Sequence, residues 1–362
     1  MTTPLRTMDY AEVVQKTKHD IMRERIPFAV MVELTHRCNL RCVHCYCPPT
    51  APAKGELTLA EWETIFDKLA EAGTIQVALT GGDPLLRRDF SEIYLAAKKR
   101  GFLVIVFTNA TLITDPILEL FSTHRPRRLE VSLYGRSEAV YTAVTQVQGA
   151  HRHCYEIVRR LVERGIPLEL KTVAMTLTKD EVYEMKAFAA EIGVPFHFDG
   201  RIHPRIDGSF KPLRYRLPPK ELAELEASSP EGLHALAENY EFAPRYDKGN
   251  ESVFQCGAGL LTATVDPYGR LHLCIVLRKP GFDLLHGDFQ DVWQGPVRAL
   301  RDVKRAPGGM TRPNQNAWAE RCPGLSYLEH GEFDRQSEYI REVSEAEQEA
   351  VRRRTRGQRI AT

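Results

Sequence analysis

The sequence predicts an α/β fold in which a parallel sheet is covered by helices. Six apolar, β-branched runs recur along the first part of the chain, and each of the first five is followed by a helix-like stretch. The runs cover residues 28–34, 75–79, 102–107, 129–133, 168–174 and 194–198. Strands that alternate with helices in this way form a parallel sheet, because parallel neighbours need crossover connections.

Local signals mark where the predicted helices begin and end. Thr58 with Glu61, and Thr178 with Glu181, have the spacing of a capping box, and residues 114–116 place a threonine cap and a proline near a first turn. The first helix has one apolar face, formed by Leu59, Trp62, Ile65, Phe66 and Leu69. A glycine suited to a left-handed C-cap stands between each helix and the next strand in four places: Gly73, Gly101, Gly165 and Gly193.

The pattern changes after the sixth run. Residues 200–217 have no clean periodicity, which predicts a loop that faces substrate, and Pro218-Pro219 then opens a helical segment. Two short apolar runs at 260–265 and 271–277 flank Asp266-Pro267-Tyr268-Gly269, which is typical of a hairpin. We therefore expect an N-terminal arm over 1–26, an α/β domain over 27–217, a helical connector over 218–251, a small domain over 252–332, and a C-terminal helix with a basic tail over 333–362.

Composition excludes several classes of protein. Lys and Arg total 49 against 48 Asp and Glu, so no overall charge favours a nucleic acid or a membrane surface, and the basic run near the C-terminus is read as a solvated helix end. No apolar run is long enough to cross a membrane and no signal peptide is recognisable, so we expect a cytoplasmic protein. In that reducing compartment, the eight cysteines indicate metal or catalytic chemistry rather than disulfides.

Three cysteines are packed into eight residues directly after the first predicted strand. Cys38, Cys42 and Cys45 have the spacing C-x3-C-x2-C. A cluster of four irons needs one thiolate per iron, so three thiolates leave one iron open to an outside ligand. A zinc site that also uses His36 or His44 stays open as an alternative. Cys47 is a spare thiol beside this loop, and Cys154 is expected in the core.

The other unusual residues follow the next three predicted strands. Gly81-Gly82-Asp83-Pro84 follows the second run, Thr108-Asn109 ends the third, and Ser132 with Gly135 ends the fourth. Ligands of open or barrel α/β proteins gather at the carboxyl ends of the strands. Four consecutive strand ends therefore predict one binding site.

The cysteine loop, in its setting Glu33-Leu34-Thr35-His36-Arg37-Cys38-Asn39-Leu40-Arg41-Cys42, resembles that of the radical S-adenosylmethionine enzymes. The resemblance implies a partial (β/α)6 TIM-like barrel over 27–217, with a [4Fe–4S] cluster on Cys38, Cys42 and Cys45. S-adenosylmethionine would chelate the open iron, and its reductive cleavage would give a 5′-deoxyadenosyl radical that abstracts a substrate hydrogen. An external electron donor such as flavodoxin or ferredoxin is implied as well.

Further positions resemble the family's cofactor-binding residues. The turn Gly81-Gly82-Asp83-Pro84 would receive the cofactor's ammonium group, with Asp83 where Glu is more frequent. The resemblance also assigns cofactor contacts to His44, beside the adenine, to Asn109, and to Ser132, near the carboxylate or ribose. Two positions depart from the family, Tyr134 where Asp is frequent and Thr145 near the place of an arginine, and Lys171 is a candidate substitute.

A second group of cysteines lies in the last third of the chain. Cys256, Gly269 and Cys274 form C-x12-G-x4-C across the predicted hairpin, and Cys322 follows after a long gap. This spacing resembles the SPASM/twitch extension and implies a twitch-like domain over 252–332 with one auxiliary iron–sulfur cluster. His272 and His330 are candidates for a fourth ligand. One zinc ion, or three ordinary buried cysteines, stays open as an alternative.

Relatives with such extensions act on ribosomal peptides, on sulfatase-type proteins or on small molecules. We expect oxidative post-translational modification of a ribosomally made peptide, such as a crosslink, with the leader peptide recognised either by a separate protein or by direct binding to the barrel. The alternative is a small-molecule dehydrogenase, epimerase or decarboxylase, in which arginines of the 200–217 loop bind an anionic group: Arg201, Arg205, Arg214 and Arg216. A third possibility is a non-catalytic iron–sulfur or zinc protein.

Overall fold

A computed structural model describes residues 21–49, 52, 54–246, 252–254, 256–304 and 322–360. Of the predicted N-terminal arm, only the last six residues lie within these ranges, and residues 21–24 are helical. No helix among the described residues is long and apolar enough to cross a membrane.

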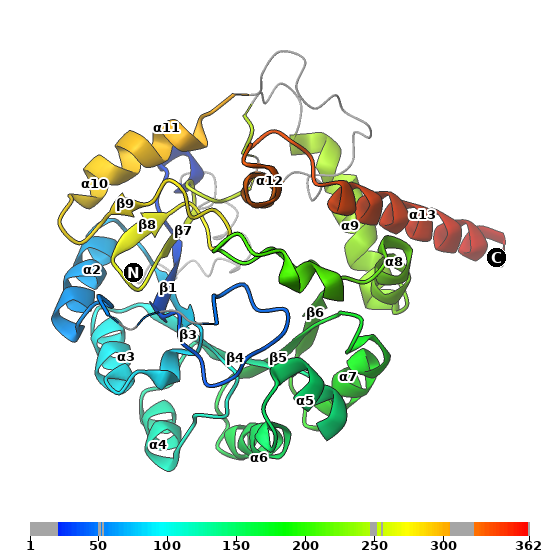
Figure 1. Cartoon of the computed structure of the whole chain (residues 1–362), viewed down its shortest axis with the longest axis horizontal. Helices are drawn as coiled ribbons and strands as arrows, with labels where there is room; N and C mark the ends of the chain where they lie inside the picture. The colour runs from blue at the N-terminus through cyan, green and yellow to red at the C-terminus, as the bar shows by residue number, and fades with distance from the viewer. Residues whose placement is uncertain are drawn as a thin grey trace, which may run out of the picture.

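The first six strands form the predicted parallel sheet. They pair in chain order, each parallel to the next. The strands are β1 (Ala29–Thr35), β2 (Gln76–Gly81), β3 (Leu103–Thr108), β4 (Arg128–Ser132), β5 (Leu168–Val173) and β6 (Phe196–Asp199). The helices that join them are α2 (Leu59–Glu71), α3 (Phe90–Lys99), α4 (Asp115–Thr123), α5 (Glu138–Thr145), α6 (Ala150–Glu163) and α7 (Val182–Glu191). Figure 1 shows the strands in an inner arc with these helices outside, as in a partial barrel.

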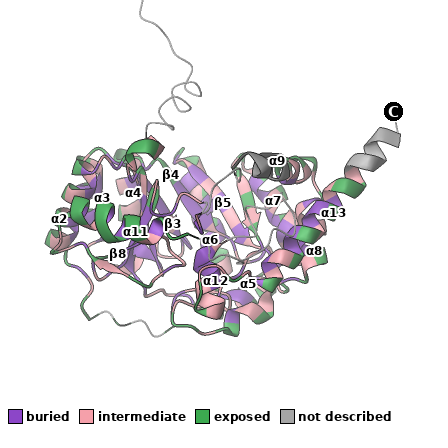
Figure 2. Cartoon of the chain, turned by 90° about the horizontal axis from the view of Figure 1, so that it is seen from above, coloured by how far each residue is buried: buried purple, intermediate pink, exposed green. Residues whose placement is uncertain are grey.

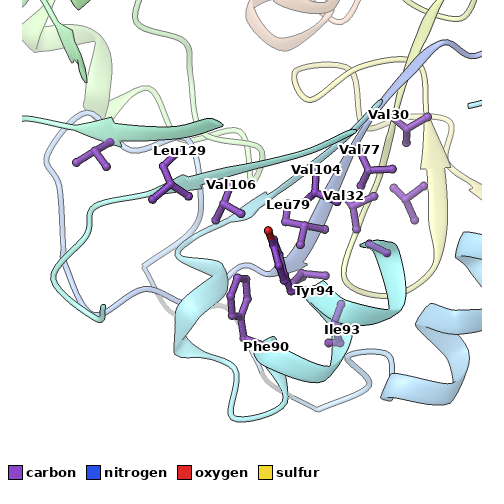
Figure 3. Close-up of a cluster of buried hydrophobic side chains, with 14 of the residues drawn as sticks. Val30, Val32, Val77, Leu79, Phe90, Ile93, Tyr94, Val104, Val106 and Leu129 are labelled. Carbon is purple, nitrogen blue, oxygen red and sulfur yellow. The ribbon is translucent and has the colours of Figure 1, made fainter. Parts of the chain in front are cut away.

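The outer face of the sheet forms the main core. Val32, Leu79 and Val106 stand in register on neighbouring strands and point toward α3, where they meet Phe90 and Tyr94 (Figure 3). Buried positions follow the strands and the helix faces that cover them (Figure 2). Because side chains alternate along a strand, the intervening residues face the barrel interior. That second set is mixed: it includes the polar Glu33, Thr80, Glu130 and Lys171 together with apolar residues such as Ile105 and Phe107.

The sheet continues into the C-terminal part of the chain. In the described residues it has nine strands, and β7 (Thr262–Val265) pairs in parallel with β1, with Ala29 opposite Thr262. β8 (Arg270–His272) pairs antiparallel with β7, and β9 (Phe282–Asp283) follows. The predicted hairpin is confirmed, and its strands extend the barrel sheet.

The C-terminal helices cover the remaining side of the barrel. α8 (Pro219–Glu226) starts at the predicted prolines and packs along α13 (Glu338–Ile360), the predicted charged C-terminal helix (Figure 1). The others are α9 (Pro230–Tyr246), α10 (Phe289–Val292), α11 (Arg298–Arg301) and α12 (Pro323–His330), and a short π-helical segment, Trp293–Val297, joins α10 to α11.

One predicted capping box forms and one does not. Thr58 and Glu61 exchange side-chain and backbone hydrogen bonds at the start of α2. The prediction for Thr178 and Glu181 is wrong: the Thr178 hydroxyl bonds the β5 end, 2.7 Å from the Val173 carbonyl, and Glu181 accepts backbone N–H groups from Arg136 and Ser137. Thr114 precedes α4 but makes no side-chain cap. The four predicted C-terminal glycines all have positive φ.

Two buried glutamates share one arginine where α13 meets α8. Arg201 donates to Glu226 Oε1 at 3.4 Å and to Glu347 Oε1 at 2.6 Å. Burial and the nearby Glu347 raise the pKa of Glu226 to about 9. Glu226 is therefore protonated in the folded protein at neutral pH.

We expect this proton to make folding stability fall as the pH rises. Between the unfolded pKa of 4.5 and the folded pKa of about 9, the folded state binds a proton that the unfolded state has released. A Glu226→Gln variant, which needs no proton, should gain melting temperature relative to wild type as the pH increases across that window. Thermal unfolding of both proteins over this pH range measures the difference. A constant difference in melting temperature would contradict the assignment.

Candidate active site

The predicted cysteine loop follows β1 and is tied to the end of α5. Arg41 N donates to the Thr145 carbonyl and Val43 N to the Val144 carbonyl, both at 3.0 Å. Cys45 N closes a turn on the Cys42 carbonyl at 3.1 Å. These backbone bonds fold the loop back across the carboxyl ends of the strands, which is where the three thiols were expected.

The three thiols lie close enough together for Cys38 and Cys45 to raise the pKa of Cys42. Burial, with the neighbouring Cys45 and Cys38, raises the pKa of Cys42 well above its usual value. Cys38 Sγ accepts hydrogen bonds from Leu40 N at 3.4 Å and from Asn109 Nδ2 at 3.6 Å. Buried thiols that repel each other as thiolates, yet are offered N–H donors, suit a cationic iron cluster. Within the described residues no three His, Cys, Asp or Glu side chains are arranged to hold a single metal ion.

The glycine turn after β2 packs against the start of the cysteine loop. Gly82 N donates to the Thr35 carbonyl at 2.7 Å, and Asp83 N donates to the Arg37 carbonyl at 2.9 Å. A Cβ on Gly81 would lie 2.0 Å from the Thr35 oxygen, and one on Gly82 would lie 2.2 Å from the Arg37 oxygen. Both positions therefore require glycine because two backbone segments touch there.

A Gly82→Ala variant should lose the geometry of this turn. The added methyl group meets backbone atoms that no side-chain rotation can move, so we expect a loss of stability of about 1–3 kcal/mol or more and a sharp drop in affinity for S-adenosylmethionine. Chemical denaturation and equilibrium dialysis measure the two effects. Gly295→Ala is the matched control, since a Cβ there meets nothing within 4 Å. Equal behaviour of the two variants would contradict the role of the turn.

Asp83 joins the ends of β2 and β3. Its carboxylate is fully buried and accepts hydrogen bonds from Thr108 Oγ1 at 2.8 Å, Asn109 N at 2.9 Å and Leu85 N at 3.0 Å. Burial raises its pKa to about 6, against the lowering effect of these donors. Three internal donors use most of the acceptor capacity of the carboxylate. In this structure Asp83 positions the turn and Asn109, and the predicted contact with the cofactor's ammonium group stays a prediction.

The remaining predicted cofactor residues fall into two groups. Asn109 lies beside Cys38, and its Nδ2 also donates to Asn39 Oδ1 at 3.0 Å, while Pro84 opens a short 3₁₀ turn next to it. His44 and Ser132 instead lie around Tyr134: the His44 and Tyr134 ring centroids are 5.7 Å apart, and burial raises the pKa of Tyr134, while Ser132 is near enough to its hydroxyl to lower that pKa. Burial lowers the pKa of His44 to about 4, so the ring is neutral.

Two further sequence candidates have internal roles. Lys171 donates to Glu130 Oε2 at 3.0 Å and lies 3.6 Å above the Phe107 ring, inside the barrel. Thr145 is buried, and its hydroxyl bonds the Tyr141 carbonyl at 2.8 Å. Cys154 is fully buried in α6, as expected of a core residue.

The second cysteine group also comes together. Burial raises the pKa of Cys322 to about 11, and the nearby Cys274 and Cys256 add to that shift. The sulfur of Cys322 caps α12, where it accepts from Leu325 N at 3.4 Å. The candidate ligand His272 is engaged elsewhere, with Nε2 2.9 Å from Asp266 Oδ2 in the hairpin.

The arginines of the 200–217 loop are mostly used inside the protein. Arg201 pairs with two glutamates as described above, and Arg216 donates to Glu329 Oε1 at 2.8 Å. Arg205 Nε donates to the Cys45 carbonyl at 3.3 Å, and Arg214 contacts its neighbour Tyr215. The loop therefore contacts the cysteine loop, as expected of a segment near substrate, but these four arginines do not form a free anion site.

Sequence reasoning missed one buried ion pair at the site. Glu33, on the interior face of β1, is bound by both terminal nitrogens of Arg278 and by the Tyr46 hydroxyl. The signal in the sequence was an acidic residue inside the otherwise apolar run 28–34. Its arginine partner stands far away in the chain and carries no local signal.

Comparison with known proteins identifies the barrel. The Radical SAM superfamily profile matches residues 32–190. The subtilosin biosynthesis protein AlbA of Bacillus subtilis is 22% identical over 315 residues, which cover 83% of this chain and 66% of that protein. The PqqA peptide cyclase of Bradyrhizobium diazoefficiens is 34% identical over 149 residues, 41% of this chain and 39% of that enzyme. The chain thus spans less than two thirds of the length of either relative.

Solved structures share the fold. Streptococcus suis SuiB bound to its precursor peptide SuiA superposes with a TM-score of 0.68 at 14% identity, covering 94% of this chain and 84% of that one. The protein anSMEcpe with bound AdoMet and Cp18Cys peptide gives 0.64 at 13% identity, covering 90% and 97%. The profile match shows that residues 32–190 carry a radical SAM domain, the domain of a superfamily of enzymes that bind a [4Fe–4S] cluster and S-adenosylmethionine, and the solved structures share the fold of this chain.

Proposed function

We propose that this protein modifies a ribosomally made peptide by radical chemistry. Residues 27–217 would form the radical SAM barrel, with Cys38, Cys42 and Cys45 as ligands of the cluster. When bound, the cluster and cofactor would supply radical chemistry, in which a 5′-deoxyadenosyl radical would take a hydrogen atom from the substrate. The observation that carries the proposal is that the cysteine loop, the Gly81-Gly82 turn and Asn109 converge at one edge of the sheet.

The chain's own residues would hold and orient the cofactors. The Gly81-Gly82 turn lets backbone approach closely, Asp83 fixes Asn109 beside Cys38, and the neutral His44 ring offers an uncharged surface next to Tyr134. Neutral, buried groups of this kind suit an adenine base better than charged ones do. The barrel interior behind them carries charged groups such as Glu130 and Lys171 beside apolar ones such as Phe107, and would receive the substrate.

The second cysteine group supports an oxidative outcome. We propose that residues 252–332 hold one auxiliary iron–sulfur cluster on Cys256, Cys274 and Cys322. A crosslink between two side chains releases two hydrogens; the first leaves with the radical, and the second as a proton and an electron. The auxiliary cluster is the proposed acceptor of that electron. A flavodoxin or ferredoxin would supply the electron that starts the reaction, and a separate protein would recognise the leader peptide.

A peptide substrate is favoured over a small molecule by two findings. Several relatives are named PqqA peptide cyclase, against one named as a heme synthase, and a similar structure holds a precursor peptide. Two of the four loop arginines on which a small anionic substrate would depend, Arg201 and Arg216, are paired with glutamates within the protein.

Anaerobic reconstitution with iron and sulfide tests the proposal. About eight irons per chain are expected for two [4Fe–4S] clusters. Reduction in the presence of S-adenosylmethionine should then release 5′-deoxyadenosine, and a precursor peptide encoded beside this gene should lose two hydrogens per crosslink by mass spectrometry. A protein that binds no iron would contradict the proposal, and about four irons per chain would contradict only the proposed auxiliary cluster. If the cofactor is cleaved and the peptide is unchanged, but a small molecule is altered, the substrate is a small molecule and not a peptide.

A further inference from the structure

One buried ion pair connects the two cysteine groups. The side chain of Glu33 has no exposed surface and that of Arg278 is 10% exposed. Arg278 binds the carboxylate with both terminal nitrogens, and the Nη2 to Oε1 distance is 2.8 Å. Burying two charges is costly, and a two-bond pair of this geometry offsets much of that cost.

The arginine end of the pair belongs to the auxiliary site. Arg278 stands four residues after Cys274, and its Nε donates to the Ile275 carbonyl at 2.7 Å. Leu277, the residue before it, donates its N–H to Cys274 Sγ at 3.3 Å. The position of the guanidinium group and that of the Cys274 sulfur are therefore set by the same short segment.

The glutamate end belongs to the cofactor site. The Tyr46 hydroxyl donates to Glu33 Oε1 at 2.9 Å and lies 3.3 Å from the Gly81 carbonyl. Tyr46 follows Cys45 directly, and His36 Nε2 lies 3.3 Å from Glu33 Oε2. The Glu33 carboxylate thus contacts Tyr46, beside the cysteine loop, and Arg278, near the auxiliary thiols. Tyr46 in turn contacts the glycine turn at Gly81.

A second buried pair leads to the same tyrosine. Arg216 donates to Glu329 on α12, the helix that Cys322 caps, and both side chains are about nine-tenths buried. Arg216 belongs to the loop in which Ile206 N donates to the Tyr46 carbonyl at 3.0 Å. Tyr46 is therefore held from both the Cys274 side and the Cys322 side.

We propose that Glu33 and Arg278 are positioning residues that fix the auxiliary centre against the cofactor site through Tyr46 and balance the charge between the two clusters. This inference rests on the proposed auxiliary cluster. Burial raises the pKa of Glu33, but His36 and Arg278 outweigh it and hold that pKa at about 2, so both partners are charged at neutral pH. A charge left alone in such a low-dielectric site acts strongly on neighbouring centres.

The two single substitutions should move the reduction potential of the auxiliary cluster in opposite directions. Reduction adds negative charge to a cluster, so a nearby positive charge favours it. Glu33→Gln leaves Arg278 uncompensated and should raise the potential, while Arg278→Met leaves Glu33 uncompensated and should lower it. The double variant removes both charges and should return the potential close to that of wild type.

Redox titration followed by EPR on the reconstituted full-length protein measures these potentials. Arg100→Met is the control, because that arginine forms a surface pair with Asp67 between α2 and α3 and should leave the potential unchanged. Iron is counted in every variant. Shifts of equal sign, or no shift at full iron content, would overturn the inference and leave the proposed function intact.

The conservative variant Arg278→Lys provides a further test if Glu33→Gln or Arg278→Met does not fold. It keeps the charge but not the two-bond geometry, so we expect a wild-type potential together with slower coupling of cofactor cleavage to substrate oxidation. A potential shifted as far as that of Glu33→Gln would contradict charge balance. A wild-type protein with only about four irons overturns the auxiliary cluster and this inference together.

Discussion

Replacing Cys38, Cys42 and Cys45 together by alanine is expected to abolish release of 5′-deoxyadenosine and to lower the iron content by about four per chain. The three thiols are the only proposed protein ligands of the first cluster, and they lie on one loop held by backbone hydrogen bonds to α5. Because those bonds do not involve the sulfurs, the barrel should still fold. Iron analysis, circular dichroism and a cofactor-cleavage assay on the same preparation separate loss of the cluster from loss of the fold.

The matched control for this variant is Cys154→Ala. That thiol is buried in α6, its pKa is raised to about 12 by burial, and it lies in the main core. Its removal should cost some stability but no iron. If the triple variant retained full iron and cleavage, the assignment of the first cluster would be wrong and a radical enzyme would no longer be a tenable reading.

The second large effect is expected at Asp83. Its replacement by alanine leaves buried donors of Thr108, Asn109 and Leu85 without their acceptor, at about 1–3 kcal/mol each. We expect a loss of at least about 3 kcal/mol in the free energy of unfolding. Affinity for S-adenosylmethionine should fall as well, since Asn109 would no longer be held against Cys38.

Thr108→Val provides a graded control for Asp83→Ala. It removes one of the three donors and keeps the carboxylate, so its loss of stability should be about 1–2 kcal/mol with most of the cofactor affinity retained. Urea unfolding and cofactor titration measure both quantities. Full cofactor cleavage by Asp83→Ala, at temperatures where it is folded, would show that the turn does not depend on this acid.

The strands and the cysteine loop were predictable because their signals are local. Strands β2 to β6 are apolar runs with a glycine shortly before or after them, and the spacing of the cysteine loop places its three thiols close together in any fold. The Thr178 and Glu181 prediction shows the limit of such signals. The spacing of a capping box was present, but backbone donors of Arg136 and Ser137 on a neighbouring loop bind the Glu181 carboxylate instead.

Pairings between distant charges were not predictable. Glu33 and Arg278 are 245 positions apart, and the sequence around either residue gives no indication of the other. For the same reason the arginines of the 200–217 loop suggested a substrate site, although Arg201 and Arg216 have glutamate partners on α8, α12 and α13. Position after a strand predicted Asp83 at the cofactor site, but only the structure shows that its carboxylate is bound by Thr108, Asn109 and Leu85 inside the protein.

The parallel pairing of β7 with β1 has a consequence for synthesis of the chain. Ala29 leaves the ribosome early, but its partner Thr262 follows only after nearly all of the barrel has been made. At about 5–20 residues per second, the open edge of β1 waits for tens of seconds. During that interval it can pair with a strand of another molecule. Slow translation, or a shortened chain that ends before β7, should therefore favour aggregation. The yield of folded protein in the cell should depend on how quickly the last third of the chain is translated.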